Sequence, residues 1–427
     1  MKNGLWKHAV FIATSILLAS CGGGGGGAAS LPVSGAKQPL VQVSTFQTAS
    51  VVVGQPTFTT GSANQGGSAG PNTIQNPYGN PLVLDGRLYL PDYTNNRVLG
   101  FNTVPASNAA AADFVLGQPN LVTTSTGSGA NQMTGPQTIK AANGKFFLDD
   151  YGNHRVLIWN SPPTTDQAPA DVVVGQPAFG SMVSSCTGTG LWFPESIEIA
   201  GGKLIVADSK HNRVLIWNSI PAANGAPADV VLGQADFTHC EKNDDNQDGT
   251  ADATPTDRTF NYPAGIWSNG VKLVIADHWN NRVLVWNTIP TSNFAPADVV
   301  LGQGDFTHFQ KNDDNQNGAA ESLPSARTLF DPYFIDSDGT HLFVTDSGNN
   351  RVLVWNSIPA SNFAPADTVL GQGGFSYSMY NDDNQDNAFD AFPTGRTLNY
   401  PAGLCVAGTQ LIVTDNSNNR FLIFDSH

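Results

Sequence analysis

Asn350-Arg351-Val352-Leu353-Val354-Trp355-Asn356 is the clearest copy of a block that recurs through this chain. Its arginine stands at Arg97, Arg155, Arg213, Arg282, Arg351 and Arg420, with gaps of 58, 58, 69, 69 and 69 residues. A second block, an apolar residue followed by Gly-Gln, has its glycine at Gly54, Gly117, Gly175, Gly233, Gly302 and Gly371. Two blocks that each occur six times indicate a repeat architecture.

Each repeat also contains four short apolar runs bounded by Gly, Asn, Asp or Pro, for example 263–267, 272–276, 282–286 and 297–301. Four strands in about 60 residues predict one blade of a β-propeller. The last repeat ends after its third strand at Phe424, whereas the Gly-Gln block at 50–55 precedes any first strand. We therefore expect an all-β, six-bladed β-propeller of four-stranded blades, in which the N-terminal strand pairs in the last blade and closes the ring. A linear solenoid is the competing architecture.

The composition agrees with this fold class and excludes others. Gly (44) and Pro (27) make up 71 of the 427 residues, and only 13% are charged, which excludes an all-α protein. The formal net charge is −15, from 35 acidic and 20 basic residues. A phosphate backbone would be repelled, so nucleic acid is not an expected partner.

Three segments carry a resemblance to a known repeat family: 204–214, 344–352 and 413–420, each of the form Val-Thr-Asp or Val-Ala-Asp followed by a short turn and Asn-Arg. They are similar to the core of NHL repeats, and the resemblance extends over about 49–424. It implies a propeller of the NHL type. The loops that follow Gly-Gln are longer here than is usual in that family.

The first residues predict export. Lys2 and Lys7 precede an apolar run at 9–18 that is too short to span a bilayer. Leu18-Ala19-Ser20-Cys21 resembles the lipobox of bacterial lipoproteins, which implies acylation of Cys21; an ordinary signal peptide with an incidental cysteine is the alternative. Because Gly22 follows the cysteine, the resemblance implies the outer membrane. The expected domains are a signal peptide (1–20), a lipidated cysteine with a Gly-rich tether (21–48) and the propeller (49–427).

An aspartate lies five residues before every repeated arginine, so the two should face each other across the turn between the second and third strands. We interpret these residues as architectural rather than as a ring of ligand-binding arginines, because every blade has them. The pairs are Asp92/Arg97, Asp150/Arg155, Asp208/Arg213, Asp277/Arg282, Asp346/Arg351 and Asp415/Arg420. An aromatic residue repeated in the third strand is expected to pack between blades: Phe101, Trp159, Trp217, Trp286, Trp355 and Phe424.

Repeats four to six contain 11 additional residues, which include an acidic motif of calcium-loop type. Oxygen donors fall at positions 1, 3, 5 and 9, as in EF-hand and dockerin-like loops, but a proline stands at position 12 in place of a bidentate Glu. The predicted cofactor is calcium, bound weakly; an acidic, solvated turn copied with its repeat explains the same residues, and the sequence leaves both open. The candidate metal ligands are Asp244, Asn246, Asp248, Asp252, Asp313, Asn315, Asn317, Glu321, Asp382, Asn384, Asp386 and Asp390.

These observations favour a monomeric, exported lipoprotein whose propeller is a binding platform for a protein or glycan, attached to the membrane only through its lipid anchor. The alternative is a metal-dependent lyase or lactonase-like enzyme in the central channel, using the first-strand acids Glu195, Glu198, Asp331 and Asp336. Cys186 and Cys240 lie in loops of neighbouring blades, where an oxidising compartment would permit them to pair or leave them free. Cys405 is expected to be a small buried hydrophobe.

Overall fold

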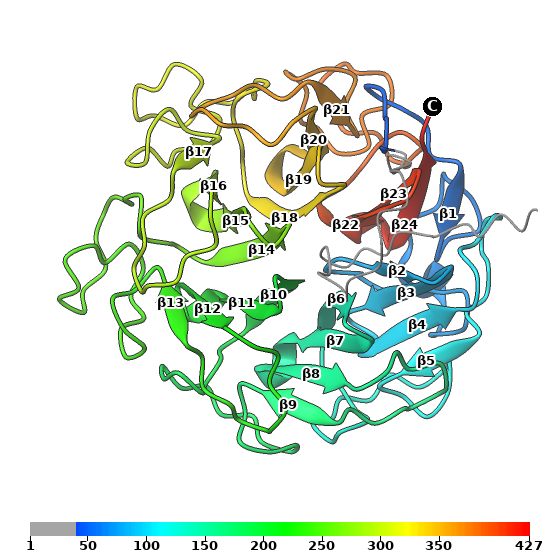
Figure 1. Ribbon diagram of the computed structural model, residues 1–427. Coiled ribbons are helices and arrows are strands. Elements are labelled where there is room, and N and C mark those ends of the chain that lie inside the picture. Colours follow the sequence, from blue (N-terminus) through cyan, green and yellow to red (C-terminus); the bar gives the residue numbers. More distant parts are fainter. Residues whose placement is uncertain (1–39) are drawn as a thin grey trace, which may run out of the picture.

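The computed structural model describes residues 40–427 and consists of six four-stranded antiparallel sheets around one axis (Figure 1). The expected signal peptide, Cys21 and most of the expected tether lie outside the described residues. The first strand of each blade lies innermost: β2 (Leu82–Leu84), β6 (Pro136–Ala142), β10 (Pro194–Ala200), β14 (Pro263–Ser268), β18 (Pro332–Ser337) and β22 (Pro401–Ala407). The six-bladed propeller predicted from the repeats is confirmed.

The other strands follow outward in chain order. The second strands are β3 (Arg87–Asp92), β7 (Lys145–Asp150), β11 (Lys203–Asp208), β15 (Leu273–Asp277), β19 (Leu342–Asp346) and β23 (Gln410–Asp415). The third strands are β4 (Arg97–Phe101), β8 (Arg155–Trp159), β12 (Arg213–Trp217), β16 (Arg282–Trp286), β20 (Arg351–Trp355) and β24 (Arg420–Asp425). The fourth strands are β5 (Phe114–Leu116), β9 (Val172–Val174), β13 (Val230–Leu232), β17 (Val299–Leu301), β21 (Thr368–Leu370) and β1 (Val51–Val53).

Helical structure in residues 40–427 is limited to single 3₁₀ turns. One precedes the first blade, and five follow second strands, namely η1 (Ala63–Gly66), η2 (Tyr151–Asn153), η3 (Ser209–His211), η4 (His278–Asn280), η5 (Ser347–Asn349) and η6 (Asn416–Asn418). Within that range, no helix has the length and hydropathy that a membrane span needs.

The ring is closed by the two ends of the propeller chain. β1 pairs antiparallel with β24, with Val52 opposite Leu422. This pairing gives the last blade its fourth strand, so the linear solenoid is excluded. The packed chain also starts earlier than the expected boundary at 49, because Val41 is buried and the Phe46 N–H donates to the Val369 carbonyl over 3.1 Å.

The antiparallel order gives the ring two different faces. Each first strand begins on the face where the second strand ends, and each fourth strand ends on that same face. We call it the loop face, because the long connections between blades and the turns between second and third strands lie there. The opposite face carries the short hairpins between first and second strands. The repeated aromatic residues of the third strands are all buried between blades, as expected.

Six fully buried ion pairs fasten the loop face. In each, the arginine Nε lies 2.6–2.7 Å from a carboxylate oxygen of the aspartate that ends the second strand. The remaining guanidinium N–H groups donate to carbonyls of the two long loops that flank the blade; for Arg351 these are Phe375, Ser325 and Thr328. The other oxygen of the aspartate accepts a backbone N–H, that of Phe330 in the case of Asp346. One pair therefore holds one turn and two loops.

The residue before each arginine joins neighbouring blades. Asn281, for example, adopts a left-handed conformation (φ 51°), and its side-chain oxygen accepts the backbone N–H of Asp331 in the next blade over 2.9 Å. His154 takes this role in the second blade, where its Nδ1 accepts the N–H of Phe193 over 3.2 Å. Burial lowers the pKa of His154, which keeps the ring neutral and able to accept. The residues that donate these bonds each precede a proline, which opens the first strand in five blades and lies shortly before it in the first blade.

The ion pairs predict the cost of breaking one. Asp346→Asn should lower the free energy of unfolding by about 3–5 kcal/mol, because Arg351 would remain buried without its counter-charge. Urea unfolding followed by tryptophan fluorescence measures this change. Asp257→Asn is the matched control, since its pair with Arg258 is 3.6 Å long and exposed on both sides, and it should cost less than about 1 kcal/mol. Equal effects of the two substitutions would contradict the role given to the buried pairs.

Candidate functional site: the mouth of the central channel

A cavity of about 270 Å³ opens at the centre of the loop face. Its lining includes four tyrosines, a glutamine and a glutamate, namely Tyr78, Tyr93, Tyr151, Tyr333, Gln137 and Glu195. Tyr93 and Tyr151 follow the aspartates that end β3 and β7, and the other four residues follow the prolines that begin first strands or lead into them. The site is therefore built from several blades at once, at the ends fixed by the ion pairs.

Glu195 lines this cavity. It is 1% exposed, and its Oε1 accepts the hydroxyl of Tyr262 over 2.6 Å and that of Tyr333 over 3.1 Å. Burial raises the pKa of Glu195 to about 7, although the two tyrosine hydroxyls and the Gln137 amide oppose the rise. A carboxyl with this pKa changes charge near neutral pH, which is a property of binding and catalytic sites.

A second buried carboxyl, Asp149 of β7, lies near Glu195. Burial raises its pKa well above the usual range, and the charges of Glu195 and Asp150 raise it further. Neither carboxylate oxygen of Asp149 has a hydrogen-bond partner in the described chain. Glu195 at the mouth and Asp149 beside it are thus two neighbouring acids without an ion-pair partner in residues 40–427.

The next layer of the channel is balanced by a cation. Lys140 of β6 has its Nζ 3.0 Å from Glu198 Oε2, and both side chains are buried. Burial lowers the pKa of Lys140, but the charges of Glu198 and Asp336 outweigh this effect and raise it. Asp336 also accepts the backbone N–H of Val406 over 2.8 Å. This layer is a structural ion cluster between three blades.

The four acids proposed for an enzyme site are therefore distributed over different surroundings. Glu195 lies among tyrosines, whereas Glu198 and Asp336 share Lys140. Asp331 is half-buried, and its pKa is raised to about 6, mainly by burial and by the charge of Asp346, with Lys311 opposing. In the portion of the chain that the structure describes, no three His, Cys, Asp or Glu residues form a group that could hold a metal ion.

The acidic motifs form self-bonded turns in the three long loops before blades four, five and six, at 233–262, 302–331 and 371–400. We call these the acidic loops. In the first, the buried Asp244 accepts the N–H groups of Asp248 and Gly249 over 3.1 and 2.9 Å, and the exposed Asn246 accepts that of Asp248 over 2.9 Å. The position-9 Asp252 accepts the N–H of Asp245 over 3.1 Å.

The other two acidic loops repeat this arrangement. Asp313 and Asp382 are buried and accept the equivalent pairs of backbone N–H groups. The side-chain oxygens at positions 3 and 5 also accept main-chain N–H groups. Glu321 accepts the Asn315 amide, and Asp390 accepts the N–H of Asp383. These oxygens are of the type calcium prefers, but they are engaged by the backbone rather than gathered around a point. Calcium binding stays a prediction.

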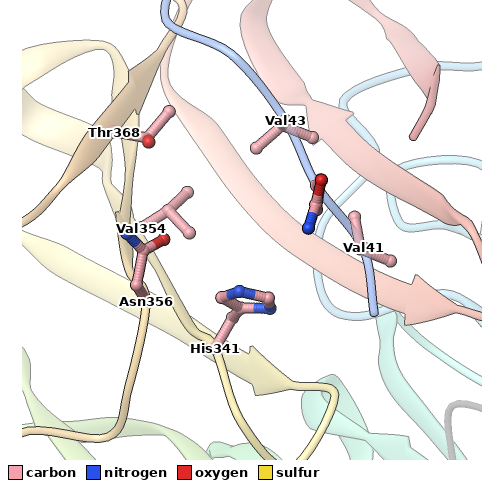
Figure 2. A pocket seen from close by; sticks show the side chains of 7 residues that line it. Val41, Val43, His341, Val354, Asn356 and Thr368 are labelled. Carbon is pink, nitrogen blue, oxygen red and sulfur yellow. The ribbon is translucent and has the colours of Figure 1, made fainter. Parts of the chain in front are cut away.

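The structure also places the three cysteines of residues 40–427 and a pocket at blade five. Cys186 and Cys240, on the loop face, are joined by a disulfide with a Cα–Cα distance of 6.3 Å. Cys405 is buried in β22. On the opposite side, residues 41–43 lie over blade five beside a pocket of about 340 Å³ (Figure 2). There Asp338 accepts the Val41 N–H and contacts the ring of His341.

Sequence reasoning found Glu195 but missed its neighbours. Tyr78, Tyr333 and Gln137 follow the proline that opens a first strand, or a proline just before it, and that position was a usable signal. Asp149 and Lys140 carried no such signal, because what surrounds them depends on the packing of adjacent blades. The sequence likewise carries no signal for His278, which is 4% exposed and whose ring centroid lies 4.2 Å from that of Tyr333, with the ring planes tilted by 51°.

No model of a known protein family matches this chain, and no curated protein matches it. Among solved structures, it is similar to a catalytically inactive virginiamycin B lyase from Staphylococcus aureus with quinupristin, at 14% identity and a TM-score of 0.41, over 83% of this chain and 97% of that one. It is also similar to the PQQ-bound aldose sugar dehydrogenase from Streptomyces coelicolor, at 11% identity and a TM-score of 0.43, over 84% and 96%. Likeness at this level carries no information on activity or ligand.

Proposed function

We propose that this chain is an exported, lipid-anchored binding protein of the NHL propeller type, which recognises a partner protein with its loop face. The observation that carries the proposal is the distribution of exposed apolar side chains. In residues 40–427 nine large hydrophobic side chains are exposed, and eight of them lie on the loop face. They are Val122, Met182, Val183, Trp279, Leu323, Met379, Phe389 and Phe392.

Exposed apolar groups gathered on one face are typical of protein interaction surfaces. Phe389 and Phe392 are 60% and 69% exposed and lie in the last acidic loop. Phe389 stacks on Tyr380, with ring centroids 5.0 Å apart, beside a pocket of about 460 Å³. A rigid aromatic pair of this kind can anchor a partner at a small cost in conformational entropy.

The charge of the acidic loops indicates the kind of partner. Together they contain sixteen acidic and five basic residues. The three loops precede consecutive blades, so they occupy neighbouring sectors of the ring (Figure 1). A partner with a basic surface would be attracted to this sector, and its association should slow as ionic strength rises.

The course of the N-terminus supports the proposed orientation. The described chain begins at blade five, on the face opposite the loop face, where Asp338 accepts the Val41 N–H. If Cys21 carries the lipid, as the lipobox implies, the loop face can point away from the membrane. The Cys186–Cys240 disulfide supports an oxidising, extracytoplasmic location.

The enzyme alternative receives less support. A lyase or lactonase site of the proposed type requires four acids to meet at one point, whereas Glu198 and Asp336 share one cation, Lys140, in the layer below Glu195. Glu195 keeps the perturbed pKa of a functional group, but a binding role accounts for it as well.

Photo-crosslinking tests the loop face. A photo-reactive residue replacing Phe392 in the intact, lipidated protein should give a specific protein adduct in the producing cell. The same residue at Val271, which is 60% exposed on the opposite face, is the matched control and should give none. Adding Phe389→Ser should reduce the adduct formed at position 392, because the stacked anchor is lost.

Two outcomes would contradict the proposal. Adducts formed only from position 271, or from neither position, would remove the loop face as the interface. An adduct whose mass is removed by glycosidase and not by protease would replace the protein partner by a glycan.

Calcium binding to the acidic loops is the second test. If the loops bind calcium, about 10 Kd of the ion should stabilise the chelator-treated protein by about 1.4 kcal/mol per site, seen as a higher melting temperature. Glu321→Gln, at position 9 of its loop, should reduce this gain. Asp314→Asn, at position 2 and bonded to Ser325, should leave it unchanged. A melting temperature insensitive to calcium would leave the self-bonded turn as the whole explanation.

A further inference from the structure

The channel mouth contains unpaired hydrogen-bond acceptors that the loop-face partner does not explain. Glu195 Oε2, both oxygens of Asp149 and Nδ1 of His278 are buried without a partner in the described chain. The carboxylate oxygens accept hydrogen bonds when ionised, and Nδ1 of the neutral His278 ring accepts one when the ring proton is on Nε2. Native structures seldom leave buried acceptors unpaired. Glu195 lines the cavity, and the other two residues lie beside its lining, Asp149 near Glu195 and His278 against Tyr333. Together they indicate a ligand that brings donors.

Among residues 40–427, the first strands supply no cation to this level of the channel. Lys140 is the only basic residue in the six first strands, and it is committed to Glu198 and Asp336 in the layer below. Two neighbouring buried carboxyls cannot both ionise without a counter-charge. A ligand that carries positive charge would supply what the chain lacks.

The walls of the cavity suit a cation as well. Tyrosine faces attract positive charge through the ring quadrupole, and four tyrosines line this cavity. Two aromatic rings beside the cavity already contact one cation, because Lys210 Nζ lies 5.7 Å from the ring centre of Tyr262 and 5.4 Å from that of Trp279. The two rings are themselves stacked at 4.5 Å.

We propose that the channel mouth binds the ammonium group of a small organic amine, with Glu195 and Asp149 as its counter-charge and Tyr78, Tyr93 and Tyr151 as its walls. A primary amine fits better than a quaternary one, since its N–H groups pair with the orphaned acceptors. The volume of about 270 Å³ is roughly that of nine water molecules. It therefore admits a short alkylammonium group.

The acids give this site a defined pH dependence. The pKa of Glu195, raised to about 7 by burial, means that a proton occupies the carboxyl below neutral pH and competes with the amine. Burial and the charge of Glu195 also raise the pKa of the neighbouring Asp149 well above its usual range. The other titratable neighbours stay neutral between pH 6 and 9, because burial raises the pKa of Tyr78, Tyr93, Tyr151, Tyr262, Tyr333 and Tyr400 and lowers that of His278 to about 3. Affinity should therefore rise with pH through 7, and binding should release protons.

Calorimetric titration of the full chain with n-butylammonium tests the proposal. We expect tighter binding at pH 8 than at pH 6, with proton release detected by comparing buffers of different ionisation enthalpy. n-Butanol, a neutral molecule of the same shape, should not bind, and tetramethylammonium should bind more weakly. Glu195→Gln should weaken n-butylammonium by about tenfold or more and remove most of the pH dependence. The exposed Glu241→Gln changes net charge equally and should have no effect.

A second pair of variants tests the proposal even if Glu195→Gln fails to fold. Tyr93→Phe retains the ring face and Tyr93→Leu removes it, so Tyr93→Leu should bind n-butylammonium more weakly than Tyr93→Phe does. Absence of binding, equal binding of n-butanol, or full affinity in Glu195→Gln would overturn the proposal. Equally strong displacement by potassium chloride would instead assign the cavity to an inorganic cation. None of these outcomes bears on the crosslink from position 392.

Discussion

The buried pair between the last residue of each second strand and the first residue of each third strand is the constraint on which this propeller depends. Replacing a buried ion pair by apolar residues is often neutral for stability, so its value here is positional. The guanidinium of Arg282 bonds Asp277 and three loop carbonyls, those of Phe306, Thr256 and Thr259. Each pair thus couples a rigid strand end to two loops that have little secondary structure of their own.

The turn between the second and third strands also fixes the backbone just before the channel strands. The asparagine or histidine beside each arginine accepts the backbone N–H of a residue in the next blade, and that residue precedes a proline at or shortly before the start of the first strand. That residue has a positive φ in every blade, for example 60° in Tyr262 and 48° in Phe193, which is uncommon outside glycine. A conformation of this kind persists only where its surroundings determine it. The tyrosine-lined mouth is therefore placed by six interblade bonds rather than by the channel strands alone.

The repeats were enough to predict the six blades, the four strands in each and the closure by β1, because all three follow from the spacing of local motifs. Spacing could not predict which side chains meet across blades. Glu195 and Glu198 appeared equivalent on one strand, but β10 changes register between Pro194 and Ser196. The irregularity helps to separate a residue among tyrosines from one paired with Lys140. The start of the packed chain was also misplaced, since the contact of Val41 with Asp338 has no sequence signature.

The contrast between the two channel layers argues that the mouth is shaped for a ligand. Lys140 lies between Glu198 and Asp336. This fold can therefore place a cation beside buried carboxyls where only stability requires it. It leaves Glu195 and Asp149 without such a partner, at the open end of the channel and among aromatic faces. Local departures from favourable chemistry in an otherwise consistent fold are expected where function requires them. The uncompensated charge of the mouth is then a binding determinant, and the compensated layer below it is the rigid floor that keeps the determinant in place.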